Sequence, residues 1–462
     1  MICLQKPESV FILFGFIFGV LVILITPPFQ VPDEASHFFR ALGISQGDFI
    51  PKVNGNVAGD FIPLNAIATG GELAGYLAFK PQSKQSFEKL AYFLSLPPKP
   101  EQKQFVKHQI IYSPLPYLPQ MLGISIGKIF HLSWLKIMYL GRLSALIVWL
   151  LCVYMAIKLM PTSKWLLCLL ALSPMIIFQA ASLSADSLII AVCFLFISIL
   201  LKIALDKEIK SSQLLVLLIL LFSLAIFISL SKPNYVFIIF LFFLIPVNQL
   251  GSKQYGWFFV LMLLSSISIT ATWSYLIRDI YAAYHSWRPL PPGQIISSSE
   301  QFKFVLNYPL QYLDVLINTT KLQGLYLIET FIGKLGWLDT SLPHWLLFLH
   351  SMMLIIYALI DSKPDITFLS AQKAIIALVW LGAAVLIYTS IYFSFTPIGN
   401  KVVDGLQGRY FIPIGILFFL LFYNNYFQIK QEKLLLITIS YIPLLLTTML
   451  AALINRYYVQ LF

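Results

Sequence analysis

The chain has 462 residues, of which 59% are hydrophobic and only 11% are charged. Soluble domains carry about 25% charged residues, so this composition excludes an ordinary soluble protein. The formal net charge of +11 does not indicate nucleic acid as a partner, because lysines in cytoplasmic loops and contacts with anionic membrane lipid account for it. Part of this positive charge is available to bind a phosphate group.

Apolar stretches long enough to cross a hydrocarbon core, about 20 residues each, recur along the whole chain. We therefore predict an all-α polytopic membrane protein, because lipid forces backbone polar groups to pair within helices. The first stretch is interpreted as a retained span and not as a signal peptide, because it lacks an A-x-A-like cleavage site. The eleven predicted spans are residues 9–26, 137–158, 165–183, 187–205, 212–230, 235–249, 256–277, 342–360, 371–394, 410–427 and 434–454.

Residues 113–131 either cross the membrane or lie along its surface, because they carry Pro114 and Pro116 near their start and Lys128 further along. If they lie flat, the short lysine-rich loops all fall on the side of the N-terminus, which the positive-inside rule identifies as the cytoplasm. We therefore predict a cytoplasmic N-terminus and an outer C-terminus, although Arg456 near the outer end opposes this orientation weakly. The lysines concerned are Lys158, Lys164, Lys202, Lys207, Lys210, Lys253, Lys363, Lys373, Lys430 and Lys433.

On this topology residues 27–136 and 278–341 form two large outer loops of a single membrane domain, residues 1–462. Loops of this length are rarely structureless inside a compact protein. Residues 33–47 have helical spacing, with Phe38, Ala41 and Leu42 on one apolar side, which predicts a short helix on the membrane surface. Further interfacial helices are expected within residues 296–335.

Unusual polar residues fall at the outer ends of the predicted spans. Asp33 and Glu34 lie just past the first span, and other acids and bases come from distant parts of the chain. Ionisable groups near a membrane are costly and usually face a cavity or a partner. The remaining members of this set are Arg142, Asp186, Lys232, Asp339 and Arg409.

Each of these residues also has a simpler interpretation. Asp33 and Asp186 could cap the helices that follow them. Lys232 and Arg409 could extend to lipid phosphates, and His37 could be an ordinary surface histidine. A single site formed by these residues is favoured because the predicted topology places all of them on the same side of the membrane.

This set of side chains suits group transfer from a lipid phosphate. Carboxylates act as general bases or hold a divalent metal, while arginine and lysine bind phosphate at the lipid boundary. Asp33, Glu34 and Asp186 are the catalytic candidates, and the same three carboxylates are the candidates for a metal, whose presence the sequence leaves open. The substrate-binding candidates are Arg409, Lys232, Arg142, Tyr410, Gln407 and His37.

The order of several motifs resembles that of the bacterial predicted membrane proteins of domain of unknown function 2142 (DUF2142). The resemblance covers about residues 9–450. It rests on "PPFQVPDEASHFFRA", "YSPLPYLPQMLGI", "GRLSALI", "LSPMIIFQAASLSADSLIIA", "LSKPNY", "FIGKLGWLDTSLP" and "GLQGRYFIPI".

That family is grouped with the GT-C glycosyltransferases, so the resemblance implies a GT-C-like fold with juxtamembrane helices in a long first outer loop. It also implies that Asp33 matches the first-loop catalytic acid, with Glu34 beside it, and that Asp186 matches the second acidic position. "SPLPYLP" is similar to a juxtamembrane segment of those enzymes. The chain departs from them in lacking a DxD at the second acid, which leaves metal dependence open, and in lacking a large soluble C-terminal domain.

The resulting prediction is a glycosyltransferase of the bacterial inner membrane. It would move a sugar from a polyprenyl-phosphate donor to a cell-envelope glycan or lipid acceptor on the outer face. The alternative is a non-enzymatic transporter or assembly factor for lipid-linked saccharides. The depth of the charged residues separates the two, because a transporter places ionisable groups and broken helices near the midplane.

Overall fold

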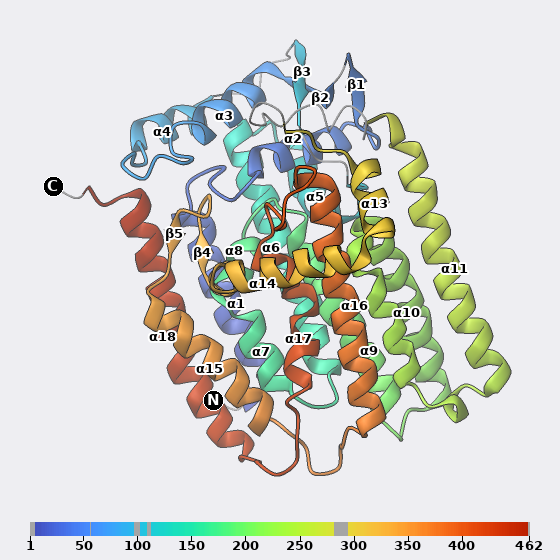
Figure 1. Ribbon diagram of the computed structural model, residues 1–462. Helices are drawn as coiled ribbons and strands as arrows, with labels where there is room; N and C mark the ends of the chain where they lie inside the picture. The colour runs from blue at the N-terminus through green and yellow to red at the C-terminus, as the bar shows by residue number, and fades with distance from the viewer. Residues whose placement is uncertain (1–4, 56, 97–101, 109–111, 281–293, 461–462) are drawn as a thin grey trace.

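The computed structural model describes residues 5–55, 57–96, 102–108, 112–280 and 294–460, which form a helical bundle beneath a smaller cap (Figure 1). Seven helices are long and apolar enough to cross a membrane. This confirms the predicted all-α polytopic class. The seven helices are α1 (Pro7–Ile25), α6 (Trp134–Leu159), α9 (Asp186–Leu205), α10 (Ser211–Ser231), α11 (Ser252–Leu276), α16 (Ser370–Phe395) and α18 (Gln431–Tyr457).

The other four predicted spans are shorter or interrupted. Residues 165–183 form two helices, because Pro174 has no N–H to continue the first of them. Residues 235–249 are mainly a 3-10 helix, whose rise of about 2 Å per residue lets 12 residues cover roughly 24 Å. These segments are α7 (Lys164–Ala171), α8 (Pro174–Ala180), η3 (Pro233–Leu244), η4 (Val247–Gln249), α15 (His344–Ile360), η5 (Gly408–Phe411) and α17 (Ile412–Leu420).

Helix α9 lies at the centre of the bundle, and most of its side chains are buried. It packs against α6, α10, α17 and η3. Asp186 is its first residue, so a buried helix holds that carboxylate in place. We call the end of the bundle beneath the cap the upper end and the opposite end the lower end.

The cap is built from the first large loop, and it contains a small antiparallel sheet that the all-α prediction did not include. Strand β2 lies between β1 and β3, with Val53 opposite Ala58 and Phe61 opposite Phe105. The helix predicted from residues 33–47 is present as α2, but it is packed against β2 and α5 and largely buried instead of resting on the membrane surface. The cap elements are α2 (Glu34–Ile44), β1 (Lys52–Asn54), β2 (Val57–Pro63), α3 (Leu64–Ala74), α4 (Phe87–Ser95) and β3 (Lys103–Lys107).

The ambiguous stretch 113–131 forms η2 (Leu115–Tyr117) and α5 (Leu118–Ile129). A 12-residue α-helix is about 18 Å long, which is too short to cross a membrane. Gly123 and Gly127 lie against α6, and a Cβ atom at Gly123 would overlap the backbone oxygen of Leu140. Two glycines spaced by four residues let helix backbones approach closely, so α5 is fixed to the upper part of α6.

The second large loop forms α13 (Ser298–Asn307), α14 (Pro309–Ile332) and the hairpin β4 (Lys334–Leu335) and β5 (Thr340–Ser341). Residues 281–293 of this predicted loop lie outside the described part of the chain. Figure 1 shows α14 lying across the bundle and not along it. Its polar residues keep it out of the set of candidate spans.

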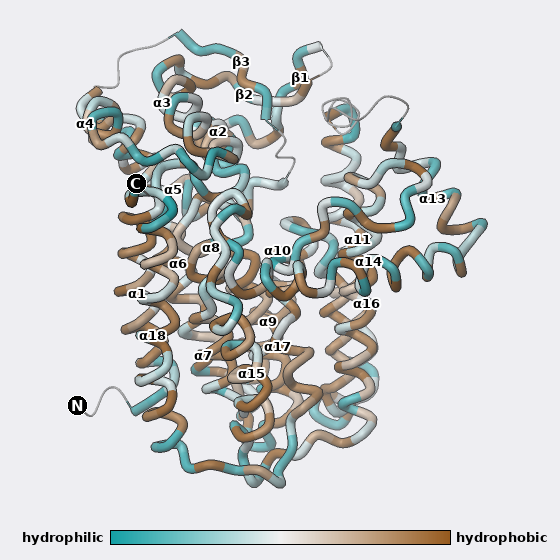
Figure 2. The backbone as a smooth tube through the Cα atoms, turned by 60° about the vertical axis from the view of Figure 1, so that its left-hand side comes forward, coloured by the Kyte–Doolittle hydropathy of each residue, from teal (hydrophilic) through white to brown (hydrophobic). Residues whose placement is uncertain are grey.

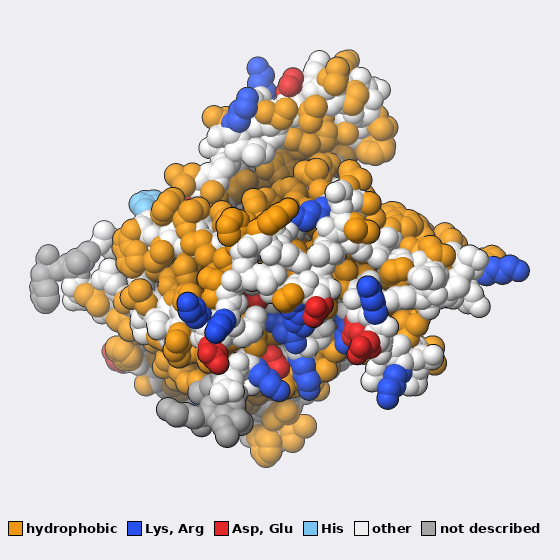
Figure 3. Space-filling model, turned by 90° about the horizontal axis from the view of Figure 1, so that it is seen from below, with side chains coloured by type: hydrophobic (Ala, Val, Ile, Leu, Met, Phe, Trp, Pro, Cys, Tyr) orange, Lys and Arg blue, Asp and Glu red, His pale blue; other side chains and the backbone are white. Residues whose placement is uncertain are grey.

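The short lysine-rich loops all join helices at the lower end, as the antiparallel order of the helices requires. Figure 3 looks onto this end and shows Lys and Arg side chains gathered among apolar surface, with a few acidic side chains between them. Figure 2 shows hydrophobic residues along the bundle and more hydrophilic ones in the cap. The short loops at the lower end therefore carry the lysines on which the predicted orientation depends.

Candidate functional site

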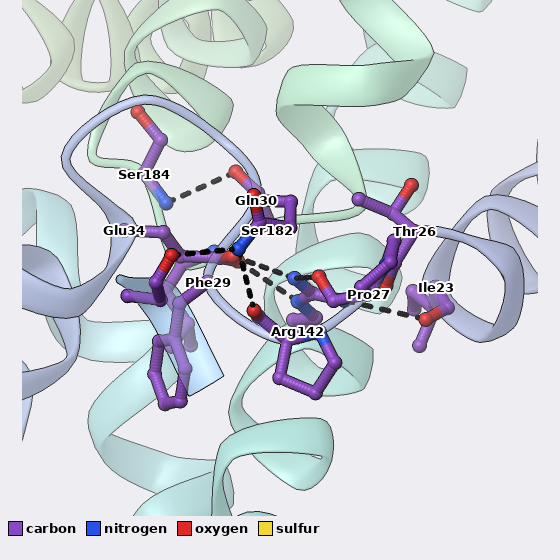
Figure 4. Close-up of polar contacts among 12 residues, drawn as sticks. Ile23, Thr26, Pro27, Phe29, Gln30, Glu34, Arg142, Ser182 and Ser184 are labelled. Atoms are coloured by element: carbon purple, nitrogen blue, oxygen red, sulfur yellow. Dashed lines mark hydrogen bonds and ion pairs between the residues drawn. The ribbon is translucent and has the colours of Figure 1, made fainter. Parts of the chain in front are cut away.

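Glu34, the first residue of α2, forms a fully buried ion pair with Arg142 of α6 (Figure 4), and both side chains are 0% exposed. The Nε of Arg142 donates to Glu34 Oε1 at 2.8 Å, and Nη2 donates to Oε2. The backbone N–H of Leu183, in the turn between α8 and α9, also donates to Glu34 Oε1 at 3.1 Å. The remaining donors of Arg142 bind backbone oxygens at and after the end of α1, namely Ile23 (3.3 Å), Thr26 (2.9 Å) and Pro27 (3.1 Å).

This arrangement leaves no donor of Arg142 and no oxygen of Glu34 without a protein partner. A phosphate could reach Arg142 only by breaking contacts that hold α1, α6 and the α8–α9 turn together. The structure therefore places Glu34 and Arg142, two of the predicted site residues, in a structural pair and not on an open binding surface.

Asp33 is oriented differently from its neighbour. Its backbone has φ 61°, in the left-handed region, which aspartate adopts more readily than most residues other than glycine. The carboxyl does not cap α2, so the capping interpretation is wrong. The residue is exposed, yet the surrounding protein partly buries the carboxyl and raises its pKa, an effect that Arg409 opposes and Asp186 reinforces.

Asp186, Lys232 and Arg409 form a charged cluster where α9 begins, α10 ends and η5 begins. Lys232 Nζ donates to Asp186 Oδ1, and Arg409 Nη1 lies 3.4 Å from Oδ2. Asp186 therefore does not cap α9, which has no side-chain cap, and neither basic group points away to lipid. Because Asp33 interacts electrostatically with Asp186 and Arg409, the structure brings these four predicted residues together at the upper end.

Aromatic rings surround the two cations. The ammonium of Lys232 lies 5.3 Å from the ring centroid of Tyr112 and 5.6 Å from that of Tyr410. The guanidinium of Arg409 lies 5.1 Å from the Tyr410 centroid, and its Nε donates to Gln407 Oε1 at 2.6 Å. Tyr410 and Gln407, predicted as substrate-binding residues, thus hold the orientation of Arg409. In the described part of the chain, Nη2 of Arg409 has no hydrogen-bond partner, which leaves a donor for an anion.

His37 lies beside this cluster but carries no charge at neutral pH. Its Nδ1 is 2.6 Å from the hydroxyl of Tyr117. Burial lowers the pKa of His37 to about 3, with Asp186 opposing the shift and Arg409 and Lys232 adding to it. The surface-histidine interpretation is wrong, because the residue is only 6% exposed. A neutral imidazole presents one donor and one acceptor nitrogen, so His37 adds hydrogen bonds but no positive charge to the site.

Asp339 belongs to a different contact. It accepts from Arg456 Nε at 3.1 Å and from Nη2 at 2.8 Å, and Arg456 also donates to backbone oxygens in the loop after α3, including Leu77 at 2.9 Å. This pair ties α18 to the β4–β5 hairpin. Because Asp339 compensates the charge of Arg456, that arginine no longer opposes the predicted orientation.

The candidate metal ligands do not form a metal site. Both oxygens of Glu34 bind Arg142, and both oxygens of Asp186 face Lys232 and Arg409. Among the described residues no three His, Cys, Asp or Glu side chains are grouped as metal ligands. The residues present therefore do not fit a divalent metal held by Asp33, Glu34 and Asp186 together.

Sequence reasoning missed the contribution of α14. Gly408 N donates to Thr330 Oγ1 at 2.7 Å, and a Cβ atom at Gly408 would overlap the backbone oxygen of Leu327. The motif "GLQGRYF" signals this close approach only through its second glycine. Helix α14 thus fixes the backbone next to Arg409.

We expect Gly408→Ala to displace Arg409, because the new methyl group meets backbone atoms that cannot move independently of α14. The free energy of unfolding in detergent should fall by about 1–3 kcal/mol, the usual cost of overpacking. Gly324→Ala, on α14 with open space around it, is the matched control and should not destabilise the protein. Unchanged stability of both variants would contradict the packing argument.

The profile of the family described as "Predicted membrane protein (DUF2142)" matches residues 16–418. The chain belongs to this family. No curated protein and no solved structure matches it. Family membership establishes a membrane protein with several apolar helices. The matched range includes Asp33 and the three residues of the charged cluster.

Proposed function

We propose that this DUF2142 protein is a glycosyltransferase that uses a polyprenyl-phosphate sugar donor at the outer face of the bacterial inner membrane. The observation that carries the proposal is the position of Asp33. Its carboxyl is accessible and caps no helix, and it lies near Lys232 and Arg409. Within the described residues, Nη2 of Arg409 remains free to donate to an anion. A general base beside a phosphate-binding group is the minimum that such a transfer requires. The acceptor is a glycan or lipid of the cell envelope.

In the proposed reaction, Asp33 takes the proton of an acceptor hydroxyl. The acceptor oxygen forms a bond to the anomeric carbon of the donor sugar, and the bond from that carbon to the phosphate oxygen breaks. Polyprenyl phosphate leaves with the bonding electrons, and Arg409 and Lys232 stabilise its negative charge. A single displacement of this kind inverts the anomeric centre.

Transport of lipid-linked saccharides is the second candidate, which the break between α7 and α8 favours, but the positions of the charged residues along the helices favour transfer. Asp186, Lys232 and Arg409 lie at helix ends and not midway along the spans. His350 is a buried ionisable residue deeper in the bundle, but Ser173 lies 2.7 Å from its Nε2 and Tyr441 3.1 Å from its Nδ1. A histidine satisfied in this way has a structural explanation.

Arg409→Ala is expected to weaken binding of undecaprenyl phosphate by at least about tenfold, since charge-assisted hydrogen bonds contribute about 1.5–3 kcal/mol. Tryptophan fluorescence of the purified protein in nanodiscs provides the measurement. Arg278→Ala is the control, because this arginine is exposed at the end of α11. Equal affinity of Arg409→Ala and wild type would remove the phosphate role, and no binding by wild type would count against the proposed donor.

The proposed orientation places the N-terminus in the cytoplasm and the cap outside. In a cysteine-free background, Ser36→Cys should react with a membrane-impermeant maleimide in intact spheroplasts, because residue 36 lies in the cap. Asp206→Cys, at the lower end of α9, should react only after permeabilisation. Labelling in the opposite order would invert the topology and place the charged cluster on the cytoplasmic side.

A further inference from the structure

A second polar group lies beside the charged cluster, on α14 and the strand that follows it. Lys334 Nζ is 3.1 Å from Glu329 Oε2 and 4.9 Å from the ring centroid of Tyr326. The phenol of Tyr326 interacts electrostatically with Tyr410, Arg409 and Glu329. The Gly408–Thr330 hydrogen bond fixes this part of α14 against η5, so both polar groups belong to one rigid unit.

The Glu329–Lys334 pair differs from the two structural ion pairs. Its side chains are 12% and 23% exposed, whereas Glu34 and Arg142 are fully buried. Arg456 donates to several backbone oxygens, but Lys334 binds a single carboxylate within the described residues. The second oxygen of Glu329 has His344 at 3.8 Å as its neighbour, beyond hydrogen-bond distance. Donors and acceptors therefore remain for a ligand.

We propose that Glu329, Lys334 and Tyr326 form the acceptor subsite and bind a neutral saccharide. This inference rests on the proposed function, because it assigns the second substrate of the same site. The pair carries no net charge, so it suits hydroxyl groups, which donate to the carboxylate and accept from the ammonium. The tyrosine adds an aromatic surface for the apolar side of a sugar ring. Lys232 and Arg409, beside Asp186, would instead bind an anion.

The test uses the full-length protein in nanodiscs and two independent probes. Saturation-transfer NMR reports weak binding of methyl α-glucoside, methyl α-mannoside and methyl α-galactoside, with sodium glucuronate as the anionic comparison. Tryptophan fluorescence reports binding of undecaprenyl phosphate. At least one neutral glycoside should give a signal with wild type, and Glu329→Gln and Lys334→Met should each reduce it at least fivefold, while undecaprenyl phosphate binding stays within twofold.

The control is Lys303→Met, which removes one member of an exposed ion pair with Glu300 on α13 and should change neither signal. No glycoside signal with wild type, an undiminished signal in both variants, or a stronger signal for glucuronate would overturn the subsite. If wild type did not bind undecaprenyl phosphate, the result would count against the proposed donor and not against the acceptor subsite. Failure of the subsite and failure of the proposed function are therefore distinguishable.

Discussion

Asp33→Asn is expected to lower the transfer rate by at least about a hundredfold, because removing a general base typically costs 10²–10⁴-fold. The variant should still insert in the membrane and fold, since the Asp33 carboxyl does not cap α2 and belongs to none of the ion pairs among the described residues. The measurement is transfer of radiolabelled sugar from its polyprenyl phosphate in membranes that contain equal amounts of protein.

The matched control is Asp279→Asn, because that side chain is 79% exposed at the end of α11 and away from the cluster.

The pH dependence of the wild-type transfer rate is a second test of the same base. A raised pKa for Asp33 means that the carboxylate is lost at a higher pH than for an ordinary aspartate, so the rate should fall earlier as the pH decreases. If Asp33→Asn kept full transfer activity, Asp33 would be excluded as the general base.

Glu34→Gln is expected to destabilise the protein by about 3–5 kcal/mol, because it leaves Arg142 buried without a charge partner. The free energy of unfolding in detergent and the yield of folded protein both report this change. Glu34→Gln combined with Arg142→Met removes both charges but also leaves the backbone oxygens of Ile23, Thr26 and Pro27 without their donor, so it should recover only part of the loss.

The same variant separates a structural role from a catalytic one. Glu34→Gln that remains folded should keep most of its transfer activity per molecule, unlike Asp33→Asn. A well-folded but inactive Glu34→Gln would instead place Glu34 in the catalytic machinery. Lys303→Met, at an exposed pair, should change the free energy of unfolding by less than about 1 kcal/mol.

The sequence predicted the fold class well, because apolar length is a property of local segments. Each of the eleven predicted spans contains helix, and those over 165–183 and 235–249 are each divided in two. The breaks within them were harder to predict. The 3-10 geometry after Lys232 and the division between α7 and α8 depend on neighbouring helices as much as on Pro233 and Pro174. The strands of the cap are short, and their pairing joins residues some 45 positions apart, which no local pattern reveals.

The candidate site shows the same division. Alternation of the helices is enough to place Asp33, Asp186, Lys232 and Arg409 at one end of the bundle. It is not enough to distinguish Asp33 from Glu34, which are adjacent and chemically alike. The tertiary structure does so, because the left-handed backbone at Asp33 directs the two carboxylates to different surroundings.

The sequence by itself therefore determined that the chain is a helical membrane protein and that its acids and bases share one end, since hydrophobic length and charge are read residue by residue. Only the tertiary structure decided which of those charges are already paired. Arg142 binds Glu34, and Arg456 binds Asp339, because a charge enclosed by protein is stable only with a partner. Arg409 keeps a donor with no partner in the described chain, because only part of its guanidinium meets Asp186 and Gln407.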